Sequence, residues 1–312
     1  MTGVSDAPLD FVIIGAQRAG STHLNASLHT HPEVFLCPDE VPYFEERFFS
    51  TTPPSVLRSV FAEAAPGQRL GIQRPEYLAA PGCARRIQAV APDARILAVL
   101  REPVSRAVSA YFWYVQFGLL PLAPLDVGMA RLLDGWADPA YPRAADILEY
   151  GLYGTHLRSY LEVFGPRRVL VLRQEDLRVA ATFGRVYQFL GVAADHPVPT
   201  LGRTTNAGVY DRRRLRVLRA RRRFVWSWDS ETTYSYRPRR LRRPFSFVPN
   251  AAVVGFDRMV LARLLGNRQP SVPPDLEARL CAFYADDLRL AESLLDLDLS
   301  AWRRPAGQPA PS

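Results

Sequence analysis

Short apolar runs alternate along the chain with longer stretches whose apolar residues recur at helical spacing. Such runs are typical of buried strands, and four are predicted, over residues 11–14, 34–37, 95–100 and 168–172. The helical stretches include 56–64, 147–164 and a closing amphipathic helix over 275–295. Strands that alternate with helices build a mostly parallel sheet with helices on both faces. We therefore predict an α/β protein, a three-layer sandwich around a mostly parallel central sheet.

The first predicted strand ends in a turn that is bracketed by Gly15 and Gly20, and a helix is expected to begin near Ser21. The glycines let the backbone turn tightly and aim its N–H groups inward. The helix adds its free N–H groups and the positive end of its dipole, which together favour an anion. The pattern predicts a phosphate-binding loop, and the alternative is a strand, turn and helix without a ligand.

The spacing from Gly15 to Gly20 matches the outer frame of the P-loop pattern G-x-x-x-x-G-K-[ST]. Ser21 stands where that pattern requires lysine, which weighs against an ordinary ATPase or GTPase. The basic residue of this loop is Arg18, inside the turn, and the hydroxyl residues Ser21 and Thr22 follow it in the sequence. A P-loop kinase or NTPase, which would bind its nucleotide with magnesium, is therefore kept as an alternative.

Composition changes the picture in one respect. All 39 basic residues are arginine, because the 312 residues include no lysine. Any cationic side chain that binds phosphate must therefore be a guanidinium group, which forms bidentate hydrogen bonds with oxyanions and stays charged. The net charge of +8 suits a polyanionic cofactor, an acidic substrate or a membrane surface, and it does not choose among them.

The three cysteines and five histidines show neither a disulfide framework nor the spacing of a metal site. We expect Cys37, Cys83 and Cys281 to be reduced and mostly buried, and we expect no metal. Residues 1–9 lack a basic start and an apolar core, and no apolar run approaches the length of a membrane span. The expected location is the cytoplasm, with peripheral contact to a membrane as an open alternative.

Three further segments carry charged or hydroxyl residues close to predicted strands. Residues 101–109 read R-E-P-V-S-R-A-V-S, residues 39–44 read D-E-V-P-Y-F, and residues 71–77 read G-I-Q-R-P-E-Y. Together with the loop G-A-Q-R-A-G-S-T-H-L over 15–24, these segments resemble the sulfotransferases that use 3′-phosphoadenosine 5′-phosphosulfate (PAPS). The resemblance is to the bacterial branch that is related to heparan sulfate sulfotransferases.

The resemblance covers roughly residues 10–205 and 272–302, and it implies a P-loop-like sulfotransferase fold in a single domain, 1–312. It also implies transfer of a sulfuryl group from PAPS to a hydroxyl on a small molecule, a glycan or a lipid-linked acceptor. Arg101 offers a charged fork and Ser109 one hydroxyl bond, a pair suited to the 3′-phosphate of the cofactor. The implied cofactor contacts are Arg18, Ala19, Gly20, Ser21, Thr22, His23, Arg101, Ser109, Tyr153, Arg203 and Asn206.

The resemblance assigns catalytic roles to two residues. Glu40 is implied as the general base that takes the proton of the acceptor hydroxyl, although Asp39 replaces a lysine that is usual in the family. Arg18 stands at the lysine of the family's phosphate loop. It can neutralise charge on the leaving oxygen, but it cannot deliver a proton at neutral pH.

Acceptor contacts are implied for Tyr43, Gln73 and Arg74. The segment 71–77 resembles the family's G-E-K-[ST]-P-x-Y loop near the acceptor, with Gln73 at the lysine and Arg74 at the small hydroxyl residue. If the register shifts by one residue, Arg74 takes the place of the lysine. Either way, the contacts on the acceptor side differ from those of the family.

The region 206–270 departs most from the family and is interpreted as an arginine-rich variable insertion or lid. Between Arg212 and Arg243 it carries arginine runs that are interleaved with aromatic residues. A lid over an acidic acceptor, a patch for anionic lipid head groups or a membrane surface, and a solvated basic face all fit this pattern. Nucleic acid is less favoured, because the phosphate-binding frame already accounts for a basic site. A non-catalytic basic binding protein derived from a sulfotransferase is a further alternative, and the oligomeric state is left open.

Overall fold

The structure is a computed structural model that describes residues 9–199, 208–220, 226–227, 237–238, 247–265, 267 and 269–303. The chain divides into two compact units. The first unit consists of Met1–Arg106, Leu152–Asn206 and Tyr284–Trp302, and the second of Ala107–Gly151, Ala207–Phe283 and Arg303–Ser312. Within the described ranges, no helix combines the length and the apolar character that crossing a membrane requires. The expectation of a single domain over 1–312 stays a prediction.

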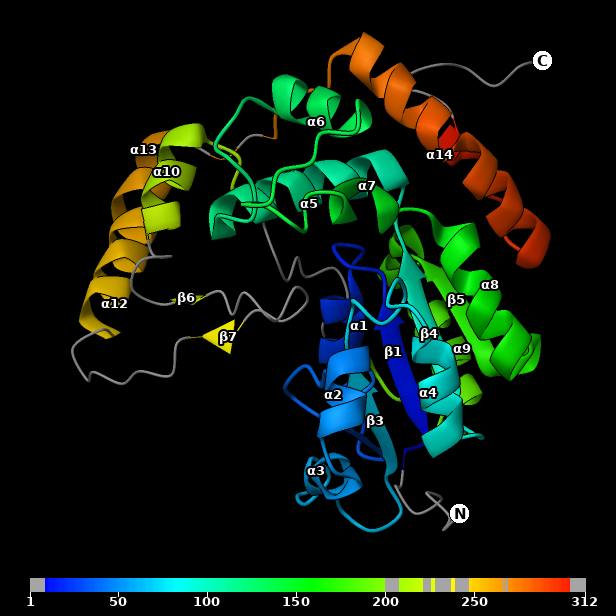
Figure 1. Ribbon diagram of the computed structural model, residues 1–312. Coiled ribbons are helices and arrows are strands. Elements are labelled where there is room, and N and C mark those ends of the chain that lie inside the picture. The colour runs from blue at the N-terminus through cyan, green and yellow to red at the C-terminus, as the bar shows by residue number, and fades with distance from the viewer. Residues whose placement is uncertain are drawn as a thin grey trace. The chain divides into compact units, whose positions relative to one another are not determined.

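The first unit is built on a five-stranded sheet in the order β2-β3-β1-β4-β5, in which all neighbouring strands are parallel (Figure 1). The strands are β1 (Phe11–Gly15), β2 (Val34–Leu36), β3 (Arg69–Gln73), β4 (Arg95–Leu100) and β5 (Val169–Arg173). Every residue of β1 is buried, as expected for a central strand that is covered on both faces.

Helices cover both faces of this sheet. On one face, apolar side chains of α1 (Ser21–Leu28) and α9 (Ala180–Leu190) share a core with alternate residues of β1 and β4. On the other face, α4 (Cys83–Val90) packs against α8 (Tyr153–Phe164), and α8 contacts β4 and β5. The three-layer α/β sandwich predicted from the sequence is therefore confirmed.

Two shorter helices and two 3-10 turns complete the chain segments between these elements. They are α2 (Glu46–Thr51), α3 (Pro54–Ser59), η1 (Pro166–Arg168) and η2 (Gln174–Arg178). A further 3-10 turn, η5 (Ser300–Arg303), follows the last helix.

The three cysteines are free and buried, as predicted.

Two elements differ from the sequence prediction. The strand β3 was not expected, because its sequence R-L-G-I-Q has only two large apolar residues and a glycine between them. Gly71 is required there by packing, since a Cβ at this position would lie 2.1 Å from the ring of Phe11. The single helix predicted over 147–164 is two helices, α7 (Asp146–Glu149) and α8, which are interrupted at Gly151.

The second unit is mainly helical in its described part. Its elements include α6 (Leu125–Leu133), α10 (Arg212–Ala220), α12 (Phe247–Phe256), the π-helical turn η4 (Asp257–Leu261), α13 (Ala262–Leu265), and the short paired strands β6 (Trp226–Ser227) and β7 (Arg237–Pro238). Two longer helices, α5 (Pro103–Phe117) and α14 (Pro274–Leu294), have residues in both units. The closing helix predicted over 275–295 is thus confirmed as α14.

The start of α8 is fixed by a carboxylate that comes from far along the chain. Asp287 on α14 is buried and accepts hydrogen bonds from the backbone N–H groups of Gly154 and Thr155, each at 2.8 Å, and from the Thr155 hydroxyl at 2.7 Å. The first N–H groups of a helix have no partner within the helix, and a negative charge there also complements the helix dipole. Asp287 therefore ties two helices of the first unit together.

We predict that Asp287→Ala lowers the free energy of unfolding by about 3 kcal/mol, because three donors in a buried helix start lose their acceptor. Urea unfolding followed by circular dichroism measures this loss. The matched control is Asp286→Ala. The Asp286 side chain is 90% exposed, and among the described residues it forms an ion pair with Arg289 alone, on the helix surface, so we expect a change within about 0.5 kcal/mol. Equal losses in the two variants would contradict the assigned role.

Candidate active site

The predicted site residues of the first unit lie where the parallel strands end. The carboxyl ends of such strands meet at one edge of a sheet, and ligands bind there in α/β proteins. The loop 15–22 follows β1, Arg101 follows β4, and Arg74 follows β3. The chain leaves β1 toward β2 on one side and leaves β4 toward β5 on the other side, so the topological switch point of the sheet lies between β1 and β4. In such sheets, ligands bind at this point.

The loop after β1 depends on backbone conformations that favour glycine. Gly15 has φ +143° and Gly20 has φ +100°. A Cβ on Gly15 would lie 2.6 Å from the carbonyl oxygen of Pro75, and one on Gly20 would lie 3.2 Å from the Gln174 side chain. No side chain caps the N-terminus of α1, so the first-turn N–H groups are presented by the bare helix end. The loop has the backbone of an anion cradle.

Arg18 and Arg101 adjoin each other at the carboxyl ends of β1 and β4. The loop is fixed to β4 by a hydrogen bond of 2.7 Å from the Ala16 N–H to the Val99 carbonyl. The guanidinium of Arg101 donates to the carbonyl oxygen of Arg18 at 3.4 Å. Two permanent cations therefore adjoin the cradle, one inside the loop and one at the end of the next strand.

Tyr153, which the sequence places among the cofactor contacts, is fully buried at the start of α8. Its hydroxyl donates to the backbone carbonyl of Arg101 at 2.7 Å. Burial raises the pKa of Tyr153, so the hydroxyl keeps the proton that it donates. Tyr153 thus positions the strand end from which Arg101 projects. Ser109 belongs to the second unit, where it is buried on α5.

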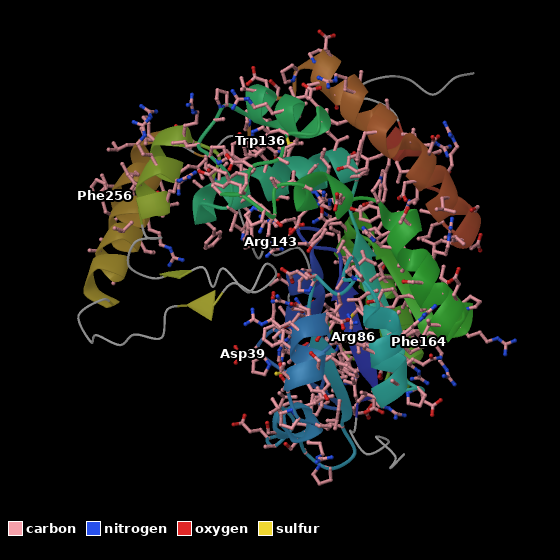
Figure 2. All side chains as sticks on the ribbon, viewed as in Figure 1. Asp39, Arg86, Trp136, Arg143, Phe164 and Phe256 are labelled. Atoms are coloured by element: carbon pink, nitrogen blue, oxygen red, sulfur yellow. The ribbon has the colours of Figure 1, made fainter. Side chains whose placement is uncertain are left out.

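Glu40 is held beside the end of β3 by its neighbours in the loop that follows β2. The Val41 N–H donates to the Gln73 carbonyl at 3.2 Å, which extends the β2–β3 pairing past the strands. The buried hydroxyl of Tyr77 donates to the Val41 carbonyl and accepts from the Phe44 N–H at 3.1 Å. The neighbouring Asp39 is exposed on the outside of the first unit (Figure 2).

Arg74 is the centre of a cluster of three carboxylates. Its Nε lies 2.7 Å from Glu45 and 3.3 Å from Glu76, and its terminal nitrogen lies 2.8 Å from Glu40. The Arg74 side chain is only 11% exposed, whereas that of Glu40 is 48% exposed. The cluster carries one positive and three negative charges when fully ionised. Although burial alone would lower it, the three carboxylates raise the pKa of Arg74.

The carboxylate cluster touches the phosphate loop. The Gln17 side-chain amide, inside the loop, donates a hydrogen bond to the Glu76 carboxylate at 3.3 Å. The backbone N–H of Arg74 donates a hydrogen bond to the Ile13 carbonyl of β1 at 3.0 Å. Desolvation, followed by the charge of Glu76, raises the pKa of Glu40, while Arg74 opposes the rise. A carboxylate with a raised pKa beside an anion cradle has the properties of a general base.

The other predicted site residues have distinct surroundings. Tyr43 is 4% exposed and packs edge-on against Phe44 and Phe49, so it belongs to an aromatic cluster beneath the Glu40 loop. Within the described part of the chain, the Gln73 Oε1 and the His23 Nδ1 are buried without a hydrogen-bond partner. Arg203 and Asn206 lie outside the described residues, as does most of the segment between Arg221 and Arg243.

Several residues of this site were not singled out from the sequence. They are Gln17, Glu45, Glu76, Tyr77 and Gln174. Glu45 directly follows the segment 39–44, and Glu76 and Tyr77 are inside the segment 71–77, so their positions were visible. Their roles depend on which strand ends are neighbours. That information required β3, which the apolar pattern did not reveal.

We predict that Arg74→Gln lowers the free energy of unfolding by about 3 kcal/mol at pH 7.5, because it leaves the largely buried carboxylates without their cation. The repulsion raises the carboxylate pKa values in the folded state above their unfolded values. Stability is then lost above those values and recovers as the pH falls, so urea unfolding at about pH 5.5 should show a smaller deficit. The control Arg69→Gln breaks an exposed pair with Asp10 and should cost less than about 1 kcal/mol at both pH values.

Comparisons with known proteins show which family the chain belongs to. The sequence matches the family described as Sulfotransferase domain over residues 8–205. The human heparan sulfate glucosamine 3-O-sulfotransferase 6 is 30% identical over 184 residues, which cover 58% of this chain and 52% of that protein. The human heparan sulfate glucosamine 3-O-sulfotransferase 3B1 is 28% identical over 185 residues, covering 58% and 45%. The chain spans about half the length of these curated relatives.

A solved structure has the same fold. The crystal structure of a sulfotransferase from Alicyclobacillus acidocaldarius matches with a TM-score of 0.63 and 23% identity, over 95% of this chain and 99% of that one. The match to the family over residues 8–205 includes β1 to β5, the phosphate loop, Glu40, Arg74 and Arg101. The chain therefore belongs to the sulfotransferase domain family.

Proposed function

We propose that this protein transfers a sulfuryl group from PAPS to a hydroxyl acceptor. One observation carries the proposal: the anion cradle after β1, the arginine after β4 and a carboxylate with a raised pKa after β2 occupy the same edge of one sheet. Family membership supplies the reaction class. We propose as the acceptor a small molecule, a glycan or a lipid-linked alcohol.

The residues present fit a donor with phosphate on two sides. When bound, PAPS supplies a sulfuryl group activated by an adjoining phosphate. The buried His23 Nδ1, which has no partner among the described residues, offers a polar contact beside the cradle. Arg18 and the N–H groups of Ala19 to Thr22 would hold the 5′ side, and Arg101 would hold the 3′-phosphate. The contact of Ser109 with that phosphate stays a prediction from the sequence.

We assign the chemistry to Glu40 and Arg18. Glu40 accepts the proton of the acceptor hydroxyl as that oxygen forms its bond to sulfur. Arg18 and the amides of the loop stabilise the negative charge that grows on the leaving phosphate oxygen as its bond to sulfur breaks. Arg74, at 2.8 Å from Glu40, holds the base in place and keeps part of its population ionised.

The ion pair between Arg74 and Glu40 also favours a second candidate. A base that is engaged by arginine at 2.8 Å has less capacity to accept a proton, which would suit a protein that binds the nucleotide without turnover. A P-loop kinase or NTPase is less favoured, because Ser21 stands where such an enzyme needs lysine. Binding with and without turnover distinguishes these candidates.

Isothermal titration with adenosine 3′,5′-bisphosphate tests the proposed nucleotide. We expect binding that does not require magnesium, and a loss of about 100-fold in affinity for Arg101→Ala, because two charge-assisted hydrogen bonds to phosphate are removed. The matched control is Arg95→Ala, at the opposite end of β4, which should bind like the wild type. Absence of binding by the wild-type protein would refute the proposed function.

The proposed base is tested by Glu40→Gln. We expect kcat to fall by about 10² to 10⁴, because the amide cannot take the acceptor proton, while affinity for adenosine 3′,5′-bisphosphate stays within about threefold. Sulfotransfer is measured with a panel of hydroxyl acceptors. The adjacent Asp39→Asn is the control and should retain wild-type kcat.

The pH dependence of the wild type follows from the same carboxylate. Glu40 acts only when ionised, so kcat/KM falls on the acid side as Glu40 becomes protonated. Because its pKa is raised, this limb should lie above the ordinary range of glutamate. A profile that is flat down to about pH 4 would contradict the assignment of Glu40 as the base.

A further inference from the structure

Half of the exposed large apolar side chains of the described residues lie in one short segment. Eight such side chains are exposed in the described part of the chain, and four of them lie between residues 256 and 264. They are Phe256 (48% exposed), Met259 (64%), Val260 (37%) and Leu264 (75%). Their spacing of three and four residues places them on one face of the continuous helix formed by α12, η4 and α13. We call these four residues the apolar stripe.

Positive charge is concentrated on the helix that carries the apolar stripe and on the neighbouring helix α10. Residues 211–220 and 247–265 together carry seven arginines against two aspartates. One arginine is neutralised, because buried Arg214 of α10 pairs with Asp257 of η4 at 2.8 and 2.9 Å. This pair holds α10 alongside the helix that carries the stripe (Figure 1). Five arginines stay exposed on the two helices: Arg212, Arg213, Arg216, Arg258 and Arg263.

We propose that the apolar stripe and its arginines dock this protein onto an anionic lipid bilayer. An amphipathic helix lies in the interface when apolar side chains enter the acyl boundary while cations meet the head groups. The stripe consists mainly of aliphatic side chains, which suit hydrocarbon, and the arginines complement negatively charged lipids. Phe256 lies on this helix in the second unit (Figure 2).

Two other occupants fit the surface less well. A second copy of the chain would bring the same five arginines together across a symmetric interface, where like charges repel. Nucleic acid is bound through aromatic side chains on which bases stack, and the stripe offers one aromatic residue among four. A bilayer satisfies both the apolar and the cationic side chains at once.

The proposal is tested with the full chain and sedimented vesicles. The probes are vesicles of phosphatidylcholine alone and of phosphatidylcholine with about 30% phosphatidylserine. We expect binding to the anionic vesicles only, and a decline between about 0.15 and about 1 M salt as screening shortens the Debye length from about 8 to about 3 Å. Equal binding to both vesicles, or no binding to either, would overturn the proposal.

Paired variants assign the binding to the stripe. Met259→Ser with Leu264→Ser should lower the partition coefficient at least about tenfold, since two aliphatic side chains no longer enter the acyl region. The control Val56→Ser with Val179→Ser removes two exposed apolar side chains, at 45% and 54% exposure, from the first unit and should bind like the wild type. If both pairs bind like the wild type, the stripe is not the docking surface.

A second pair tests the charges without altering the apolar side chains. Arg258→Gln with Arg263→Gln should weaken binding to anionic vesicles about 25-fold, at about fivefold for each arginine near the surface. Light scattering monitors self-association in the same samples. Concentration-dependent dimers that the Met259 and Leu264 variant abolishes, or wild-type binding to single-stranded RNA in place of vesicles, would assign the surface to another partner and overturn the proposal.

Discussion

The hydrogen bonds that hold β1 between β3 and β4 are the constraint on which the site depends. Both edges of β1 are paired in parallel and all of its residues are buried. Groups of this strand can therefore reach a ligand only beyond its carboxyl end. There the chain turns through Gly15 and Gly20 and presents N–H groups that the sheet no longer uses. The same parallel pairing delivers Arg74 and Arg101 to that edge. The order of the parallel strands therefore decides which loops lie together at the proposed ligand site.

Charge interactions and a hydrogen bond couple the Arg74 carboxylate cluster to the loop that follows β1. Arg74 is shared by three carboxylates, and Gln17 extends the network into the phosphate loop. A change at Glu45 or Glu76 should therefore alter the protonation of Glu40, since the same cation serves all three. In this protein the surroundings of the proposed base are set by a cluster of charges, and no single contact determines them.

The sequence predicted the parts of the site that depend on local pattern. The buried run before Gly15, the turn up to Gly20 and the arginine after β4 were all visible, because each feature occupies a few neighbouring residues. The strand β3 was missed since its Gly71 and polar ends weaken the apolar signal, although packing against Phe11 demands that glycine. The Arg74 cluster was missed for a related reason: its members come from two loops that only the sheet brings together. No local pattern encodes that proximity.

The bond from Asp287 to the start of α8 also has a consequence for the order of folding. The two partners are separated by 132 and 133 positions, and the chain emerges from the ribosome with α8 first. All five strands are synthesised before Asp287, which accepts the hydrogen bonds at the start of α8. Until then, α8 lacks these hydrogen bonds while the sheet that it covers is already complete in sequence. Contacts of such long separation slow folding and prolong exposure of apolar surface. The first unit is therefore completed only after Asp287 has been synthesised, later than α8 and all five strands.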